Sequence, residues 1–119
     1  MLAKAYRLQK DTEIKRLIHS GKTFFLPQMT IKYLFQANSG IKIGFVVSNK
    51  IDKRATVRNQ LKRRLREAVR KLLPDLKSGY SLLIIAKKSA LDLGVLSLNK
   101  QLIFALNQIK VYNKKIDKT

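Results

Sequence analysis

The 119-residue chain carries 26 lysine and arginine side chains against 7 aspartate and glutamate side chains, a formal net charge of +19 at pH 7. Its length fits one domain and is too short for two, and a hydrophobic content of 45% is ordinary for a folded globular protein. Without cysteine the chain forms neither disulfides nor thiolate metal sites, and no signal peptide or membrane-spanning segment is recognisable. The charge predicts a polyanionic partner, with nucleic acid favoured over an anionic membrane surface.

The first third of the chain predicts a short helix followed by two strands. Asp11 or Thr12 can cap a helix that Gly21 ends, and its apolar residues at helical spacing are Ile14, Leu17 and Ile18. Residues 29–36 alternate, which places four side chains on a core face: Met29, Ile31, Tyr33 and Phe35. Turn-forming residues 38–40 lead into a second alternating segment, residues 41–48. Because the turn is short, the two segments are predicted to pair as an antiparallel hairpin.

The most basic part of the chain is residues 50–71, where ten lysine or arginine side chains face only Asp52 and Glu67. At about 100° per residue, the apolar residues of a helix here fall on one stripe that docks on a sheet. The stripe consists of Val57, Leu61, Leu65, Ala68, Val69, Leu72 and Leu73. Pro74 is expected to stop this helix. Arg58, Lys62 and Arg66 follow one border of the stripe, and just beyond them lie Asn59, Arg63 and Arg70. So many cations exceed what a merely solvated face needs.

The last third predicts one strand and one helix. The apolar run at residues 80–86 is typical of a central strand, and the long helix before it favours a parallel β-α-β crossover. Ser97 is expected to cap a final helix whose core face consists of Leu98, Leu102, Ala105, Leu106 and Ile109. Four phenylalanines are expected in the core rather than as stacking platforms: Phe24, Phe25, Phe45 and Phe104. Lys87 and Lys88 either discourage edge pairing or serve a ligand.

No catalytic site carried by the protein is evident. His19 is the only histidine, and the seven acidic side chains are scattered along the chain, whereas metal-dependent hydrolysis needs clustered ligands. Glu67 is better explained as an ion-pair partner for Lys71, four residues further along a helix, than as a catalytic acid.

Residues 58–63, Arg-Asn-Gln-Leu-Lys-Arg, preceded by Lys53-Arg54-Ala55 and followed by Arg66-Glu67, resemble the signature of the bacterial ribonuclease P protein component. The helix before Gly21 and the segments 43–48 and 83–88 also fall where that family has equivalents. The resemblance implies a single small α+β domain over residues 1–119, with its core at about 5–112 and a basic tail at 113–119. In that fold a mixed sheet of about four strands packs with three helices, as in the second domain of a small-subunit ribosomal protein. The family's β-α-β crossover is left-handed, against the usual right-handed preference.

The resemblance implies a protein subunit of ribonuclease P, the endoribonuclease that removes the 5′ leader from precursor tRNA. Its implied partners are the ribonuclease P RNA and the leader, with no protein partner, no membrane and a cytoplasmic location. The protein itself binds no cofactor in that family, and the RNA subunit requires Mg²⁺ and performs the hydrolysis. A stand-alone RNA-binding protein, such as a ribosomal protein or RNA chaperone, is the alternative. The signature segment with its flanking strands favours the ribonuclease P subunit.

Two sets of site residues follow by position from the resemblance. The RNA-binding set is Lys50, Lys53, Arg54, Arg58, Asn59, Lys62, Arg63, Arg66 and Arg70. The leader cleft set is Ile14, Ile18, Lys32, Lys42, Ser48 and Lys87. The chain departs from the family at Gln60, where arginine is usual, and at Ile14 and Ile18, where phenylalanine is frequent. The first helix is therefore expected to contribute less base stacking.

Overall fold

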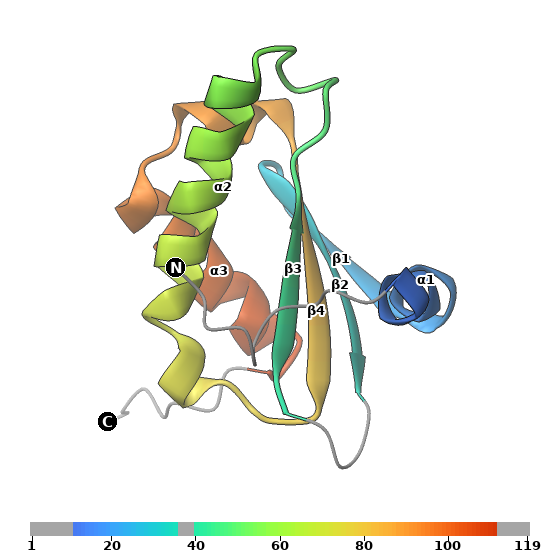
Figure 1. Cartoon of the computed structure of the whole chain (residues 1–119). Coiled ribbons are helices and arrows are strands. Elements are labelled where there is room, and N and C mark those ends of the chain that lie inside the picture. Colours follow the sequence, from blue (N-terminus) through green and yellow to red (C-terminus); the bar gives the residue numbers. More distant parts are fainter. Residues whose placement is uncertain (1–10, 36–39, 112–119) are drawn as a thin grey trace.

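The computed structural model describes residues 11–35 and 40–111, which form three helices and four strands (Figure 1). In chain order these are α1 (Asp11–Ser20), β1 (Lys22–Phe25), β2 (Met29–Phe35), β3 (Lys42–Val46), α2 (Ala55–Arg70), β4 (Tyr80–Ala86) and α3 (Val95–Gln108). Two short 3-10 segments flank β4, η2 (Leu73–Asp75) before it and η3 (Lys88–Asp92) after it. The predicted basic tail at 113–119 lies outside the described residues.

The four strands form one mixed sheet in the order β1-β2-β4-β3. β4 lies between β2 and β3, pairing antiparallel with β2 and parallel with β3. The predicted hairpin between residues 29–36 and 41–48 is therefore wrong, although each segment contains a strand. Alternation fixes which face a side chain occupies, but it does not determine which strand lies alongside. The sequence reading also missed β1, which is only four residues long and pairs antiparallel with β2.

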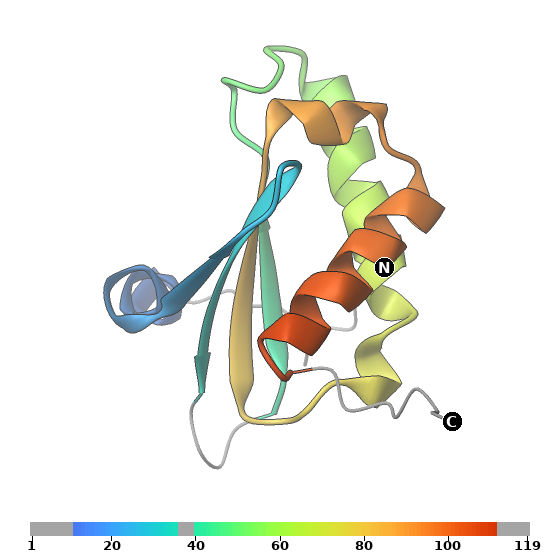
Figure 2. The same cartoon turned by 180° about the vertical axis from the view of Figure 1, so that it is seen from behind.

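The parallel β3-α2-β4 crossover is confirmed, and the two opposite views show that it is left-handed (Figures 1 and 2). Both α2 and α3 cover one face of the sheet, while α1 lies on the other face (Figure 2). The fold class implied by the resemblance is thus the observed one. General strand physics favours the opposite hand, so only the family resemblance could supply this feature.

The main core fills the space between the sheet and the pair α2 and α3. The predicted stripe of α2 is confirmed, because its buried residues are Leu61, Leu65, Ala68 and Val69. The buried residues of α3 are Leu98, Leu102, Ala105 and Leu106, also as predicted. Two side chains of α2 and α3 bond to the backbone of neighbouring elements. Asn99 Nδ2 donates to the carbonyl of Ala68 at 2.9 Å, and Arg64 Nη2 donates to the carbonyl of Leu91 at 3.2 Å. Such bonds satisfy carbonyls that burial takes away from water.

A smaller cluster holds α1 against the opposite face of the sheet. Leu17 is fully buried against Leu83, and the partly buried residues around them are Ile14, Leu34 and Ile85. α1 ends before Gly21, whose N–H donates to the Leu17 carbonyl at 2.9 Å. A Cβ at Gly21 would lie 2.3 Å from that carbonyl oxygen, so only glycine fits where α1 turns into β1. The predicted helix end is confirmed.

Several local predictions need correction. α3 begins at Val95 with Gly94 at its N-cap, so Ser97 lies inside the first turn and does not cap the helix. α2 ends at Arg70, and Pro74 lies within η2, beyond the end of the helix. Phe24 and Phe45 pack partly buried on the core.

The other phenylalanines depart from the predicted core positions. Phe25 is 72% exposed, Phe104 is 53% exposed and Phe35 is 58% exposed. Phe24 and Phe25 are neighbours on one strand and so point to opposite faces.

Candidate nucleic-acid interface

The basic face of α2 is the side of the helix that its buried stripe leaves uncovered. Arg58, Lys62 and Arg66 are partly buried along the border of the stripe, and Asn59, Arg63 and Arg70 are exposed beyond them. These positions are three or four residues apart, so their side chains project in the same general direction. The structure thus brings the six predicted helix residues together on one surface, and we use "the basic face" for these six residues.

The loop before α2 is organised by Asp52. Its Oδ1 accepts hydrogen bonds from the backbone N–H of Arg54 at 2.8 Å and from Arg54 Nε at 3.0 Å, and Oδ2 accepts from Arg54 Nη2 at 2.9 Å. Arg58 Nη1 donates to the carbonyls of Asp52, at 3.0 Å, and of Lys53, at 2.8 Å. We call these five hydrogen bonds the Asp52 clasp. They fix the loop that leads into the helix, and they engage part of two guanidinium groups that were predicted to bind RNA.

Hydrogen bonds and charge hold the Asp52 carboxyl ionised. Side-chain and backbone hydrogen bonds from Arg54, assisted by the charges of Arg54 and Arg58, keep the pKa of Asp52 well below its usual range. The same pairing raises the pKa of Arg54. Next to the clasp, Asn49, Lys50 and Lys53 line an open cavity of about 410 Å³. The clasp therefore supports a loop whose two exposed lysines border a hollow suited to an anion.

Replacing Arg54 by glutamine should raise the pKa of Asp52 toward its usual value, since the main stabilising donor is lost. Because the folded-state pKa is depressed, the carboxylate contributes stability above its ordinary pKa and loses that contribution as pH falls through the lowered value. The Arg54→Gln chain should therefore lose the clasp at a higher pH during acid titration. NMR titration of the Asp52 carboxyl measures this directly. Lys53→Gln is the matched control, and an equal rise of the Asp52 pKa in both variants would contradict the assignment.

The other cations of the basic block divide into engaged and free groups. Glu67 pairs with Arg70 and not with Lys71 as predicted, because Arg70 Nε lies 3.2 Å from Glu67 Oε1. This exposed pair lowers the pKa of Glu67 through the hydrogen bond from Arg70, and it adds little stability. Arg64, outside the predicted set, ties α2 to the chain near η3. Within the described residues, those that make no side-chain hydrogen bond or ion pair include Lys50, Lys53, Lys62, Arg63 and Arg66.

Most residues predicted for the leader cleft lie on the sheet face that carries α1, which we call the α1 face. Lys32 Nζ donates to Thr23 Oγ1 at 3.0 Å, and Lys42 Nζ forms an ion pair with Glu13 at 3.2 Å. Register places both lysines on the face of Leu83, on either side of β4. Ile14 of α1 packs partly buried against the cluster of Leu17 and Leu83, and Ile18 is 50% exposed. The two lysines are thus positioned by short contacts before any ligand arrives.

The α1 face continues past α1 to an aromatic side chain that sequence reasoning placed in the core. Phe25 lies 72% exposed, and Lys87 Nζ is 5.9 Å from its ring centroid, a cation–π distance. Lys87 Nζ also donates to the carbonyl of Leu26 at 2.8 Å. Lys87 follows β4, an interior strand, so the edge-protection reading is wrong. The signal for Phe25 was present in the sequence, because two adjacent phenylalanines on a strand cannot both face the core.

Ser48 is exposed beyond the end of β3, and no side-chain bond is recorded for it among the described residues. In residues 11–35 and 40–111, no three histidine, cysteine, aspartate or glutamate side chains gather into a potential metal site. Over the same part of the chain, no helix combines the length and the apolar character needed to cross a bilayer.

The sequence and the structure of this chain were both found to be similar to those of known proteins. A family model described as Ribonuclease P matches residues 2–110. The chain is 38% identical over 93 residues to the ribonuclease P protein component of Symbiobacterium thermophilum, covering 77% of this chain and 80% of that one. It is 37% identical over 89 residues to that of a Picosynechococcus species, covering 75% and 77%. The solved RNase P protein of Staphylococcus aureus superposes with a TM-score of 0.81 at 26% identity, covering 92% of this chain and 100% of that chain.

Proposed function

This chain belongs to the ribonuclease P protein family, and we propose from that premise that the basic face of α2 binds the RNA subunit while the α1 face holds the 5′ leader. As a protein subunit of ribonuclease P, the chain partners the ribonuclease P RNA in the endonucleolytic maturation of tRNA 5′ ends. The single observation that carries the residue assignment is that Lys62, Arg63 and Arg66, which have no partner among the described residues, gather on one side of a helix whose other side is anchored in the core.

The basic face suits a folded RNA because its cations are exposed or only partly buried and project from a rigid support. Lys62, Arg63 and Arg66 are free of partners among the described residues and project from a helix that is buried on its opposite side. Cations on a preformed surface neutralise phosphates without first becoming ordered, and each contact releases condensed counterions. The loop held by the Asp52 clasp extends the same surface through Lys50 and Lys53. Gln60, exposed on α2, supplies an amide where the family usually has a charge.

The α1 face suits a single strand because it combines charge with an exposed ring. Lys32 and Lys42 offer cations to the backbone, and Ile18 offers apolar surface from α1. Phe25, with Lys87 beside it, supplies the stacking surface that Ile14 and Ile18 do not. Stacking on such a ring does not depend on which RNA base is stacked, so it suits a leader of variable sequence.

The division of labour leaves hydrolysis to the RNA. We propose that Mg²⁺ is held by the RNA subunit and that the protein lowers the Mg²⁺ concentration required, because its cations neutralise phosphates that otherwise need metal ions. The protein residues bind and orient the RNA chains and form no covalent bond. Because the relatives are bacterial proteins and bacteria transcribe their RNA in the cytoplasm, we propose that the protein works there.

Reconstitution with a bacterial ribonuclease P RNA tests this function. The full-length chain should accelerate leader removal from precursor tRNA at low Mg²⁺, and its effect should shrink as Mg²⁺ rises and replaces it. The chain alone should not cleave, which serves as the control for contaminating nucleases. An unchanged cleavage rate across all Mg²⁺ concentrations, together with unchanged substrate affinity, would contradict the proposal.

A further inference from the structure

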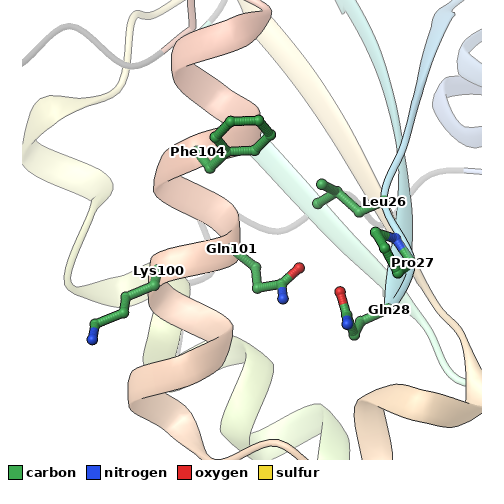
Figure 3. A pocket seen from close by; sticks show the side chains of 6 residues that line it. All are labelled: Leu26, Pro27, Gln28, Lys100, Gln101 and Phe104. Carbon is green, nitrogen blue, oxygen red and sulfur yellow. The ribbon is translucent and has the colours of Figure 1, made fainter.

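A cavity on the opposite side of the sheet from α1 is not used by either RNA surface described above. It has a volume of about 360 Å³ and lies between the turn after β1 and the outer side of α3 (Figure 3). Its lining consists of Leu26, Pro27, Gln28, Lys100, Gln101 and Phe104. This volume falls in the range of roughly 300 to 1,000 Å³ that is typical of small-molecule sites. The cavity is large enough for one heterocyclic ring system.

The wall formed by the turn is held in place from the segment that follows β4. The backbone N–H of Lys87 donates to the carbonyl of Gln28 at 2.9 Å, and Ser89 Oγ donates to the carbonyl of Pro27 at 3.1 Å. Lys87 Nζ adds the bond to the carbonyl of Leu26 at 2.8 Å. Three consecutive carbonyls are therefore fixed, which leaves the side chains of this turn preorganised.

One residue that lines the cavity carries a hydrogen-bond acceptor that lacks a donor. Gln28 Oε1 is buried, and no donor among the described residues bonds to it. The amide groups of Gln28 and Gln101 lie opposite one another across the cavity (Figure 3). A buried acceptor without a donor is costly, so a rotation of the Gln28 amide that brings Oε1 to an N–H group in the cavity is favoured. Two amides together offer both donors and acceptors to a flat heterocycle.

The remaining lining completes a site for a nucleotide. Phe104 is 53% exposed and is supported from behind by Phe24, with ring centroids 6.5 Å apart. The Lys100 side chain extends away from the cavity along the outer side of α3 (Figure 3), where it can meet a phosphate next to a bound base. An aromatic ring, facing amides and one outer cation are the groups that bind an unpaired base.

We propose that this cavity binds an unpaired adenine of RNA, an inference that rests on the proposed function. Adenine presents an amino donor beside a ring-nitrogen acceptor, which a glutamine amide matches with two hydrogen bonds. With its amide rotated into the cavity, Gln28 accepts from the amino group, Gln101 completes the recognition, and Phe104 stacks on the ring. The adenine comes either from the RNA subunit or from precursor tRNA. A protein partner is the less suitable occupant, since the two amides and the unsatisfied acceptor suit a polar heterocycle better than an apolar side chain.

Binding assays with the full-length chain separate the two sources. Gln101→Leu removes the amide. Phe104→Leu removes the aromatic ring, and the leucine at position 104 keeps apolar contact with Phe24. Each should weaken RNA binding by about 10-fold, the effect of losing a stacked or paired base. If the RNA subunit supplies the adenine, its affinity for the protein falls; if precursor tRNA supplies it, the affinity of the assembled holoenzyme for substrate falls instead. Leu96→Ala is the matched control, because Leu96 is 67% exposed on α3 and does not line the cavity.

A second measurement needs no variant and so does not depend on folding of a mutant. Adenosine titrated into the unmodified chain should shift the side-chain amide NMR signals of Gln28 and Gln101 saturably, and uridine should not. These nucleosides lack phosphate, so attraction by the net charge does not contribute. Equal effects of adenosine and uridine, or unchanged affinities in both RNA assays, would overturn the proposal. If the unmodified chain self-associates and the cavity variants do not, while RNA binding stays intact, the cavity is a protein contact and the proposal is overturned.

The helix variants discussed below separate this failure from failure of the proposed function. If they weaken RNA binding while the cavity variants do not, only the adenine site is wrong. If neither group changes RNA binding, the proposed RNA surface is wrong as well.

Discussion

Glutamine at positions 62, 63 and 66 together is expected to weaken binding of the ribonuclease P RNA by roughly 100-fold near physiological salt, because three phosphate contacts are lost. The three native side chains are free of partners among the described residues and lie on the basic face. Each phosphate contact releases nearly one counterion when it forms. Without three such contacts, the slope of log affinity against log salt should flatten by roughly three. Filter binding across a salt series measures both quantities.

The control for this triple variant removes the same charge elsewhere. Lys22→Gln, Lys77→Gln and Lys110→Gln together lower the net charge equally, and all three lysines are exposed outside α2. Binding in the control should keep a salt slope close to that of the unmodified chain. If both triple variants flatten the slope equally, diffuse net charge and not the basic face drives RNA binding.

Phe25→Ala is expected to lower the affinity of the assembled holoenzyme for precursor tRNA by about 10-fold, since one stacked base of the leader is lost. Affinity for mature tRNA, which has no leader, should stay the same. The expectation follows from the 72% exposure of Phe25 on the α1 face and from Lys87 near its ring. Fluorescence titration with both RNAs measures the difference.

Phe35→Ala is the matched control for the Phe25 variant. Phe35 is also exposed, at 58%, but it lies edge-to-face against Tyr80, with ring centroids 5.3 Å apart, at the far end of β2. Its removal should leave leader-dependent affinity nearly unchanged. An equal loss in both variants would mean that the effect comes from general destabilisation and not from stacking.

Sequence alone predicted the features that depend on periodicity. The stripe from Leu61 to Val69 was predictable because helical spacing requires buried residues every three or four positions. The side chains just outside that stripe could then be assigned to the basic face by geometry. The parallel crossover followed from the long helix between two strands.

Features that depend on tertiary pairing could not be predicted in this way. Nothing in residues 29–48 reveals that β4, made later, lies between β2 and β3. The Asp52 clasp was not predicted, because the sequence shows Asp52 only as one acidic residue among many basic ones. Its hydrogen bonds to Arg54 depend on the geometry of the loop. Phe25 was assigned to the core together with Phe24, although adjacent residues on a strand face opposite sides. Its exposure depends on β1, which the sequence reading missed.

The position of β4 has a consequence for biosynthesis. β2 and β3 pair with β4 and not with each other, so the four-stranded sheet cannot form until the ribosome has synthesised residue 86. By then the whole of α2, with its cations, has already been translated. A nascent chain therefore carries its charged segment before the scaffold that orients it exists. Contacts so distant in sequence also slow the search for the native state, and the last strand to be made is the one that completes the sheet.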